Sequence, residues 1–195
     1  KSNIDFHLEK GAVLISSLNQ EDIMDFAKLF EDDNACTGWD GGCFLFACHE
    51  ENITISGEGV IYGQGDKVFI DDDVDGGAHE CPLSVTAFRP RTTFLEDVTN
   101  LTVRDITIQD AAFWTLHMAG CHHVRVQDIK ILNDVRGANN DGIDPDCCKD
   151  VLITGCLVKT GDDAIVIKTT KPMTQRYGAS ENIVISNCIL YSHDS

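Results

Sequence analysis

Apolar and polar positions alternate in five short segments of the chain, and the arrangement is nearly the same in each. The segments open at Asn52 ("NITISGEGVI"), Asn100 ("NLTVRDITI"), His123 ("HVRVQDIKI"), Asp150 ("DVLITGCLV") and Asn182 ("NIVISNCIL"). Each begins with a polar residue, alternates apolar and variable positions, passes through polar or small residues, and alternates again. This pattern predicts strands interrupted by a short turn in every segment.

The openings of these segments lie 48, 23, 27 and 32 residues apart. The first interval is long enough for two units, and "PLSVTAF" (residues 82–88) predicts the strand of a skipped unit. Irregular repeats of this length, without helical periodicity, are typical of a parallel β-solenoid in which each turn stacks on the last. An antiparallel sandwich is the competing architecture, but its hairpins usually need frequent Asn-Gly or Asp-Gly turns, and the chain has no "NG" and has "DG" only at Asp40, Asp75 and Asp141.

Stacked turns place equivalent side chains in ladders, which gives the nine cysteines an interpretation. No Cys/His spacing matches a zinc site, so we interpret several cysteines as small buried apolar residues. The odd count leaves at least one thiol without a partner in the chain. The repeat predicts one ladder of Ile106, Ile129, Cys156 and Cys188 and another of Val98, Cys121 and Cys148.

Two segments depart from the repeat. Residues 18–44 include "QEDIMDFAKLFEDD", which predicts either a short amphipathic helix or a decorated loop. Residues 71–80, "DDDVDGGAHE", form an acidic insertion that we interpret as a solvated loop. Calcium binding is the alternative for this insertion, although its spacing matches no EF-hand.

The length of 195 residues suits one domain, and we expect a single solenoid domain over residues 1–195. The chain starts without methionine or a signal-like segment and stops abruptly, so we expect both ends to be cuts within a longer catalytic domain. No apolar stretch is long enough to span a membrane. The formal charge of -17 argues against nucleic acid and anionic membranes as partners, and it opposes an acidic polysaccharide at long range only.

Carboxylates are the candidate chemical groups, because two small acidic clusters flank one strand-like segment in "NNDGIDPDCCKDVLITGCLVKTGDD". Asp141 and Asp162 are 21 residues apart, close to one solenoid turn, so they can lie on neighbouring turns with Asp163 beside them. Three clustered carboxylates disfavour joint ionisation, which leaves one protonated acid beside an ionised base. That pairing is the equipment for glycoside hydrolysis.

Asp162 and Asp163 are adjacent, and a regular strand would point them to opposite sides. Both can face one site only if the backbone bends, and we expect Gly161 to permit that bend. The alternative is that these are turn aspartates at the corners of the solenoid, without a chemical role.

At these residues the chain resembles glycoside hydrolase family 28, the polygalacturonase and rhamnogalacturonase family. "NNDG" (residues 139–142) is similar to the family's Asn-Thr-Asp-Gly motif, and "TGDD" (residues 160–163) to its Gly-Asp-Asp motif. "SHD" (residues 192–194) falls where Gly-His-Gly is usual, and the family's Arg-Ile-Lys motif would lie beyond Ser195. "NITISGEGVIYGQG" resembles the family's Gly-rich turn, with Tyr62 where Asp is usual. "RPR" (residues 89–91) and "FWTLH" (residues 113–117) resemble the exo-acting bacterial branch.

The resemblance implies a right-handed parallel β-helix that hydrolyses a pectin-type polysaccharide or oligosaccharide with inversion, without cofactor or metal, in a secreted or periplasmic location. It implies that Asp162 is the general acid and that Asp141 and Asp163 hold and activate water. The acid and base would lie roughly 6.5–9.5 Å apart. His193 would tune the acid or hold substrate, and Asn139 would orient Asp141 or bind sugar.

Three further residues are candidates for substrate binding on chemical grounds. Trp114 offers an apolar face for a sugar ring, or else is a core aromatic. His117 contacts substrate, or else is a structural histidine. Lys168 pairs with a uronate carboxylate, or else forms a surface salt bridge.

Two other functions stay open at this point. One is a hydrolase of a different glycan with the same acids and altered binding positions. The other is a β-helical carbohydrate-binding module that does no chemistry. A polysaccharide lyase is disfavoured, because the sequence shows no cluster of calcium carboxylates with a proton-abstracting base.

Overall fold

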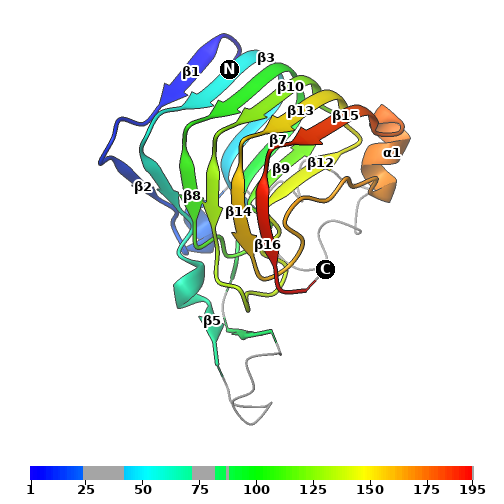
Figure 1. Ribbon diagram of the computed structural model, residues 1–195. Coiled ribbons are helices and arrows are strands. Elements are labelled where there is room, and N and C mark those ends of the chain that lie inside the picture. The colour runs from blue at the N-terminus through cyan, green and yellow to red at the C-terminus, as the bar shows by residue number, and fades with distance from the viewer. Residues whose placement is uncertain (24–41, 72–81, 87, 195) are drawn as a thin grey trace.

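Parallel strands stacked turn upon turn form the body of the computed structural model, which describes residues 1–23, 42–71, 82–86 and 88–194 (Figure 1). One run of paired strands consists of β1 (Ile4–His7), β3 (Cys43–Ser56), β7 (Arg91–Arg104), β10 (His122–Gln127), β13 (Lys149–Thr154) and β15 (Glu181–Ser186). A second consists of β2 (Val13–Ile15), β4 (Val60–Tyr62), β8 (Thr107–Gln109), β11 (Lys130–Leu132), β14 (Leu157–Thr160) and β16 (Ile189–Ser192). All pairs within these runs are parallel, so the predicted parallel β-helix is confirmed.

A third wall carries the acidic residues. The first part of β7 pairs with β9 (Leu116–Ala119), which pairs in turn with β12 (Ile143–Asp146). Isolated parallel bridges extend this wall from β12 to Ile165 and Lys168 on the following turn. Residues just before β12 and just before Ile165 are therefore neighbours in space, although they are distant in sequence.

The core lies between the walls and follows the alternation of the strands. In the first run, Ile53, Leu101, Val124, Val151 and Ile183 pair in direct register on successive turns. The first four are buried, and Ile183 packs against the same cluster. Side chains at every second position of a strand point the same way, so the apolar alternation of the repeat becomes one continuous stack.

The polar residue that opens each repeat has a backbone role. Asn52, Asn100, His123, Asp150 and Asn182 all have positive φ, between 54° and 61°, a conformation that Asn, Asp and His tolerate better than other side chains. The Asn52 amide donates to Asn3 Oδ1 at 2.8 Å, and the Asn100 amide donates to Asn52 Oδ1 at 2.9 Å. The ladder therefore begins at Asn3, one turn earlier than the sequence repeat indicates.

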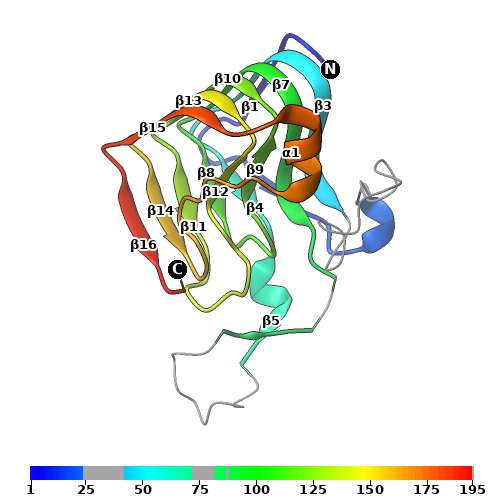
Figure 2. The same ribbon diagram turned by 90° about the vertical axis from the view of Figure 1, so that its right-hand side faces the viewer.

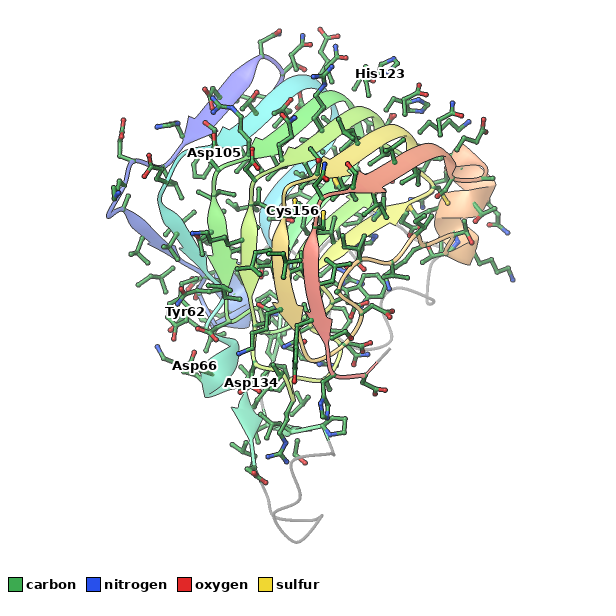
Figure 3. The ribbon with its side chains drawn as sticks, viewed as in Figure 1. Tyr62, Asp66, Asp105, His123, Asp134 and Cys156 are labelled. Carbon is green, nitrogen blue, oxygen red and sulfur yellow. The ribbon has the colours of Figure 1, made fainter. Side chains whose placement is uncertain are left out.

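Both predicted core ladders are present. The pairing of Lys130 with Thr107 and Leu157 stacks Ile129 between Ile106 and Cys156, and Cys188 follows. Cys121 stacks in the same way between Val98 and Cys148. Figure 3 places Cys156 between the strands and His123 at the outer corner. Among the described residues, seven cysteines are free thiols, five buried and two half-buried, as their interpretation as small core residues predicts.

The prediction of a skipped unit at residues 82–88 is wrong. β3 and β7 pair directly, with Ile53 opposite Leu101, so no turn of chain fits between them. Instead, β6 (Ser84–Val85) pairs antiparallel with β5 (Phe69–Ile70) in an excursion beside the coil (Figure 1). The 48-residue interval is one enlarged turn.

Helix α1 (Lys171–Tyr177) covers part of the third wall and is held at both ends (Figure 2). At its start, the backbone N–H and hydroxyl of Thr170 donate to the Asp146 carboxylate at 2.9 and 2.6 Å. At its end, the Tyr177 hydroxyl donates to the buried Glu96 at 2.8 Å, and Arg176 lies 3.2 Å from the same carboxylate. Buried carboxylates of the wall thus fix the helix.

Two expectations fall largely outside the described residues. Of the segment expected to be helix or loop, only the 3-10 turn Gln20–Asp22 and Ile23 are described, and residues 24–33 lie outside. Of the acidic insertion, residues 71–80, the structure describes only Asp71, whose carboxylate pairs with Arg136 at 2.6 Å. A second 3-10 turn, Gly65–Lys67, follows β4. Within the described part of the chain, no helix has the length and apolar character to cross a membrane.

Candidate active site

Three aspartates meet on neighbouring turns at the end of the third wall. Asp141 lies two residues before the start of β12, and Asp162 and Asp163 follow the end of β14. One oxygen of each carboxyl lies within 4.8 Å of one oxygen of the other two. Asp141 is 2% exposed, whereas Asp162 and Asp163 are half-buried. The clustering expected from the 21-residue spacing is present.

The family expectation of roughly 6.5–9.5 Å refers to the separation of the acid and base carboxyl groups. In this cluster one oxygen of each carboxyl lies within 4.8 Å of one oxygen of each of the other two. A water hydrogen-bonded at about 2.8 Å to each of two oxygens spans up to about 5.6 Å. One water therefore fits as a bent bridge between two of these carboxylates.

The backbone around Gly161 brings Asp162 and Asp163 to the same site. The Asp163 N–H donates to Asp162 Oδ1 at 2.9 Å, and the Asp163 carbonyl accepts the Gly142 N–H at 2.9 Å. Gly161 matters for a reason other than the predicted bend. Its φ is not positive, but a Cβ there would lie 2.4 Å from the Gly137 carbonyl oxygen. Close packing between turns is what excludes a side chain.

Asn140 connects the two acidic motifs. Its side-chain oxygen accepts from the Gly161 N–H at 2.8 Å and the Asp162 N–H at 3.3 Å, and its amide donates to the Asp134 carbonyl. The Asn140 carbonyl in turn accepts the Asn133 amide at 2.8 Å. Asn140 is completely buried, so these bonds fix the turn on which Asp162 sits.

Asn139 contacts a different aspartate from the one expected. Its amide donates to Asp162 Oδ2 at 3.4 Å, while its oxygen accepts from Arg89 at 3.1 Å. These contacts do not include Asp141, and the alternative role of Asn139 in binding sugar stays a prediction. Asn139 has a positive φ of 54°, which asparagine tolerates better than most residues.

Lys168 joins Asp141 to a carboxylate that the motifs did not single out. Its amine lies 2.8 Å from Asp141 Oδ2 and 3.4 Å from Asp144 Oδ1. The Lys168 side chain is 14% exposed, so the surface salt bridge considered for it is not what the structure contains. Its amine also lies 4.3 Å from the centre of the Trp114 ring.

Burial and charge shift the pKa of all three ionisable groups in this triad. Burial raises the pKa of Asp141, and Lys168 opposes the rise. Burial and the neighbouring Asp141 charge raise the pKa of Asp144 well above its usual range. Burial works against the charged form of Lys168, but the carboxylates of Asp144 and Asp141 raise its pKa overall. The sequence predicts one raised carboxyl pKa in the three-aspartate cluster, that of its acid, whereas the groups raised here are Asp141, which the resemblance assigns to activating water, and Asp144, which lies outside the predicted cluster.

Trp114 is half-buried in a stack of aromatic and basic side chains. Its ring stacks on Phe113 with 5.4 Å between centroids, and the Arg91 guanidinium lies 4.7 Å from its centroid. Arg89 and Arg91 also lie over the Phe113 ring at 4.7 and 4.8 Å. The segments "RPR" and "FWTLH" thus contact each other beside the aspartates.

His117 lies beneath this stack and is 0% exposed, so the expectation that it contacts substrate is wrong for this arrangement. Its Nε2 is 3.5 Å from Asp146, and its ring packs against Phe94 and Trp114. Burial lowers the pKa of His117 to about 4, against the opposing hydrogen bond with Asp146. The structural alternative describes this residue.

His193 follows β16 on the turn next to Asp162 and is exposed. Its two neighbours fix that turn to the acidic motif: Ser192 donates to the Asp162 carbonyl at 2.9 Å, and the Asp194 N–H donates to the Gly161 carbonyl at 3.0 Å. The backbone therefore holds His193 beside the Asp162 turn.

Tyr62, which stands where the family usually has Asp, carries its own carboxylate partner. Its hydroxyl donates to Asp66 at 2.5 Å, and this hydrogen bond raises the pKa of Tyr62 to about 12 (Figure 3).

The three-aspartate cluster is a compact acidic group, but the Lys168 amine already supplies positive charge to it, and we assign no metal cation there.

The model of the family described as glycosyl hydrolases family 28 matches residues 33–194. The polygalacturonase of Chamaecyparis obtusa is 30% identical over 139 residues, which are 71% of this chain and 25% of that protein. The chain spans about a quarter of the length of the first curated relatives that it matches.

Solved structures share the fold. The polygalacturonase from Erwinia carotovora aligns with a TM-score of 0.74 at 21% identity, over 96% of this chain and 49% of that one. A hyperthermoactive exopolygalacturonase from Thermotoga maritima aligns with a TM-score of 0.73 at 23% identity, over 96% of this chain and 48% of that one.

Proposed function

Because the chain belongs to glycosyl hydrolases family 28, we propose that it carries the acid and base of an enzyme that hydrolyses pectin-type polysaccharides or oligosaccharides. The observation that carries this proposal is the approach of Asp141, Asp162 and Asp163 within 4.8 Å on two neighbouring turns. The matched relatives named polygalacturonase support galacturonan as the substrate class.

Each aspartate has a role in the proposed reaction. Asp162, half-buried and in contact with Asn139, protonates the glycosidic oxygen as the bond to the leaving sugar breaks. Asp141 and Asp163 bridge one water, remove its proton, and direct it to the anomeric carbon from the opposite side. Attack from that side inverts the configuration.

The surroundings of the cluster complete the proposal. His193 on the neighbouring turn tunes Asp162 or contacts the sugar, and the half-buried Trp114 offers the exposed part of its ring to apolar sugar faces. The similarity of "FWTLH" to exo-acting relatives favours release of sugars from chain ends. We further propose a secreted or periplasmic location, since galacturonan lies outside the cell.

The test is a panel of galacturonan, rhamnogalacturonan and neutral plant glycans, with products followed by NMR of their anomeric protons. We expect inverted product from one anionic glycan. Asp162→Asn should reduce the rate by about 10²–10⁴-fold, since general acid catalysis contributes that much. Asp105→Asn is the matched control. Asp105 is exposed, pairs with its neighbour Arg104, and lies on a different turn from the cluster, so this substitution should leave the rate unchanged.

Three outcomes would contradict parts of the proposal. Retained configuration would overturn the water-bridging roles of Asp141 and Asp163. Cleavage of a neutral glycan alone would replace the substrate class and keep the mechanism. Binding of a glycan that survives Asp162→Asn, without any cleavage by the unchanged chain, would identify a carbohydrate-binding module.

A further inference from the structure

Asp144 is a buried carboxylate that the proposed reaction does not use. It lies on β12, three residues after Asp141, and is 0% exposed. Both of its oxygens are buried without a hydrogen-bond partner among the described residues. A buried, unpaired carboxylate is costly, so its retention beside the site calls for a compensating charge.

Lys168 supplies that charge and shares it. Its amine lies 2.8 Å from Asp141 and 3.4 Å from Asp144, so one cation faces two buried carboxylates. Trp114 covers the amine with its ring at 4.3 Å. With three partners around it and 14% exposure, the amine is directed at the wall of the coil rather than at incoming substrate.

Because other acidic groups surround Asp141, the Lys168 cation determines whether the Asp141 carboxyl is ionised. The carboxyl groups of Asp162 and Asp163 lie on the next turn, and those of Asp144 and Asp146 lie along β12. Positive charge comes from Lys168 and, beneath Trp114, from Arg91, while the buried His117 is neutral above about pH 4. Lys168 is the cation in direct contact with Asp141 within the described part of the chain. Without it, burial would favour the neutral acid at Asp141.

We propose that Lys168, covered by Trp114 and shared between Asp141 and Asp144, is a positioning residue that keeps Asp141 ionised and oriented as a base, and that Lys168 does not bind the substrate carboxylate. The role of Asp141 as base rests on the proposed function. The charge pairing itself does not, and it can be measured in the resting protein.

The first measurement is an NMR titration of the Asp141 carboxyl in protein labelled with ¹³C at aspartate carboxyls, with Asp141→Asn to assign the resonance. In Lys168→Met, the midpoint should rise by about 1–3 pH units, because an adjacent cation is lost. Lys168→Arg should restore most of it. In Asp144→Asn, the midpoint should stay or fall, because Lys168 then serves Asp141 alone.

An unchanged Asp141 midpoint in Lys168→Met, or a rise in Asp144→Asn as large as that in Lys168→Met, would overturn the proposal. If Lys168→Met does not fold, the Lys168→Arg and Asp144→Asn midpoints still decide, because the proposal requires both to stay near or below the wild-type value. These results stand whether or not the chain cleaves any glycan.

The second measurement separates positioning from substrate binding on oligogalacturonate. Positioning predicts that Lys168→Met lowers kcat by about 10²-fold with KM changed by less than about twofold, and that its acid limb moves to higher pH. A raised KM with kcat preserved would make Lys168 a substrate ligand instead. If the wild-type chain cleaves nothing, the proposed function fails while the titration still tests the pairing.

Discussion

At the scale of single residues, Asp144 connects burial to pH. Burial and the Asp141 charge raise its folded-state pKa well above the unfolded value of 3.8. The stability that its neutral form allows is therefore present below about pH 3.8 and is lost as pH rises through the folded pKa. An asparagine at this position does not titrate.

We therefore expect Asp144→Asn to gain stability over the wild type as pH rises from 4 to 7. The gain should be about 1.4 kcal/mol for each unit of pKa displacement, and it should level off above the folded pKa. Urea unfolding at several pH values measures it, with Asp105→Asn as the control. A difference that is independent of pH, or that shrinks as pH rises, would contradict the burial argument.

The sequence predicts the three aspartates of the cluster but not the residues that support them. Asp141 and Asp162 are predictable because 21 residues approximate one turn of a solenoid. Asn140 resembles an ordinary loop asparagine, and its bonds to Gly161 exist only once the turns are stacked. Asp144 alternates with Ile143, so the pattern alone assigns it to a solvent-facing position. In the structure every residue of β12 is buried, and Asp144 is buried with them.

At the scale of the element, a ladder of asparagines at Asn3, Asn52 and Asn100 links the first turns of the coil at one corner. Asn52 holds positive φ and both donates to Asn3 and accepts from Asn100. Side-chain amides stacked this way satisfy each other at the corner, where a strand ladder is interrupted. Asn52-Ile-Thr and Asn100-Leu-Thr have the form of N-glycosylation acceptors, and this ladder gives both asparagines a structural explanation.

We expect Asn52→Ala to lower the free energy of unfolding by about 1–3 kcal/mol, because it removes two hydrogen bonds and places alanine in the left-handed region. Asn52→Gly is the matched control, since it removes the same bonds without the backbone strain and should cost about 1 kcal/mol less. Equal stability of both variants would exclude a contribution from the backbone. Wild-type stability in both would exclude the ladder as well.

The pattern predicts strands more reliably than it predicts their partners. "PLSVTAF" alternates, and β6 does form within it at Ser84–Val85. Its partner, however, is β5 in an antiparallel pair rather than a neighbouring turn. Alternation reports that one side of a strand is covered, and a short excursion can supply that cover as well as the coil can.

At the scale of the whole molecule, the net charge of -17 opposes a polyanionic substrate. Raising NaCl shortens the Debye length from about 30 Å at 10 mM to about 8 Å at 150 mM, which screens this repulsion. We expect kcat/KM on galacturonan to rise several-fold over that range. The same rise should be absent for any neutral substrate that is cleaved, and a fall on galacturonan would mean that local basic side chains control the encounter.

The excursion of β5 and β6 shows that a turn of the coil can change its number of residues while its strands keep their register with the neighbouring turns. One turn takes 48 residues and the next takes 23, yet Ile53, Leu101 and Val124 still pair in line. New material can therefore be grafted at a corner while the stack above and below keeps its alignment. An evolving lineage could acquire a new binding arm at such a corner by insertion alone, without rebuilding the core or moving the aspartates.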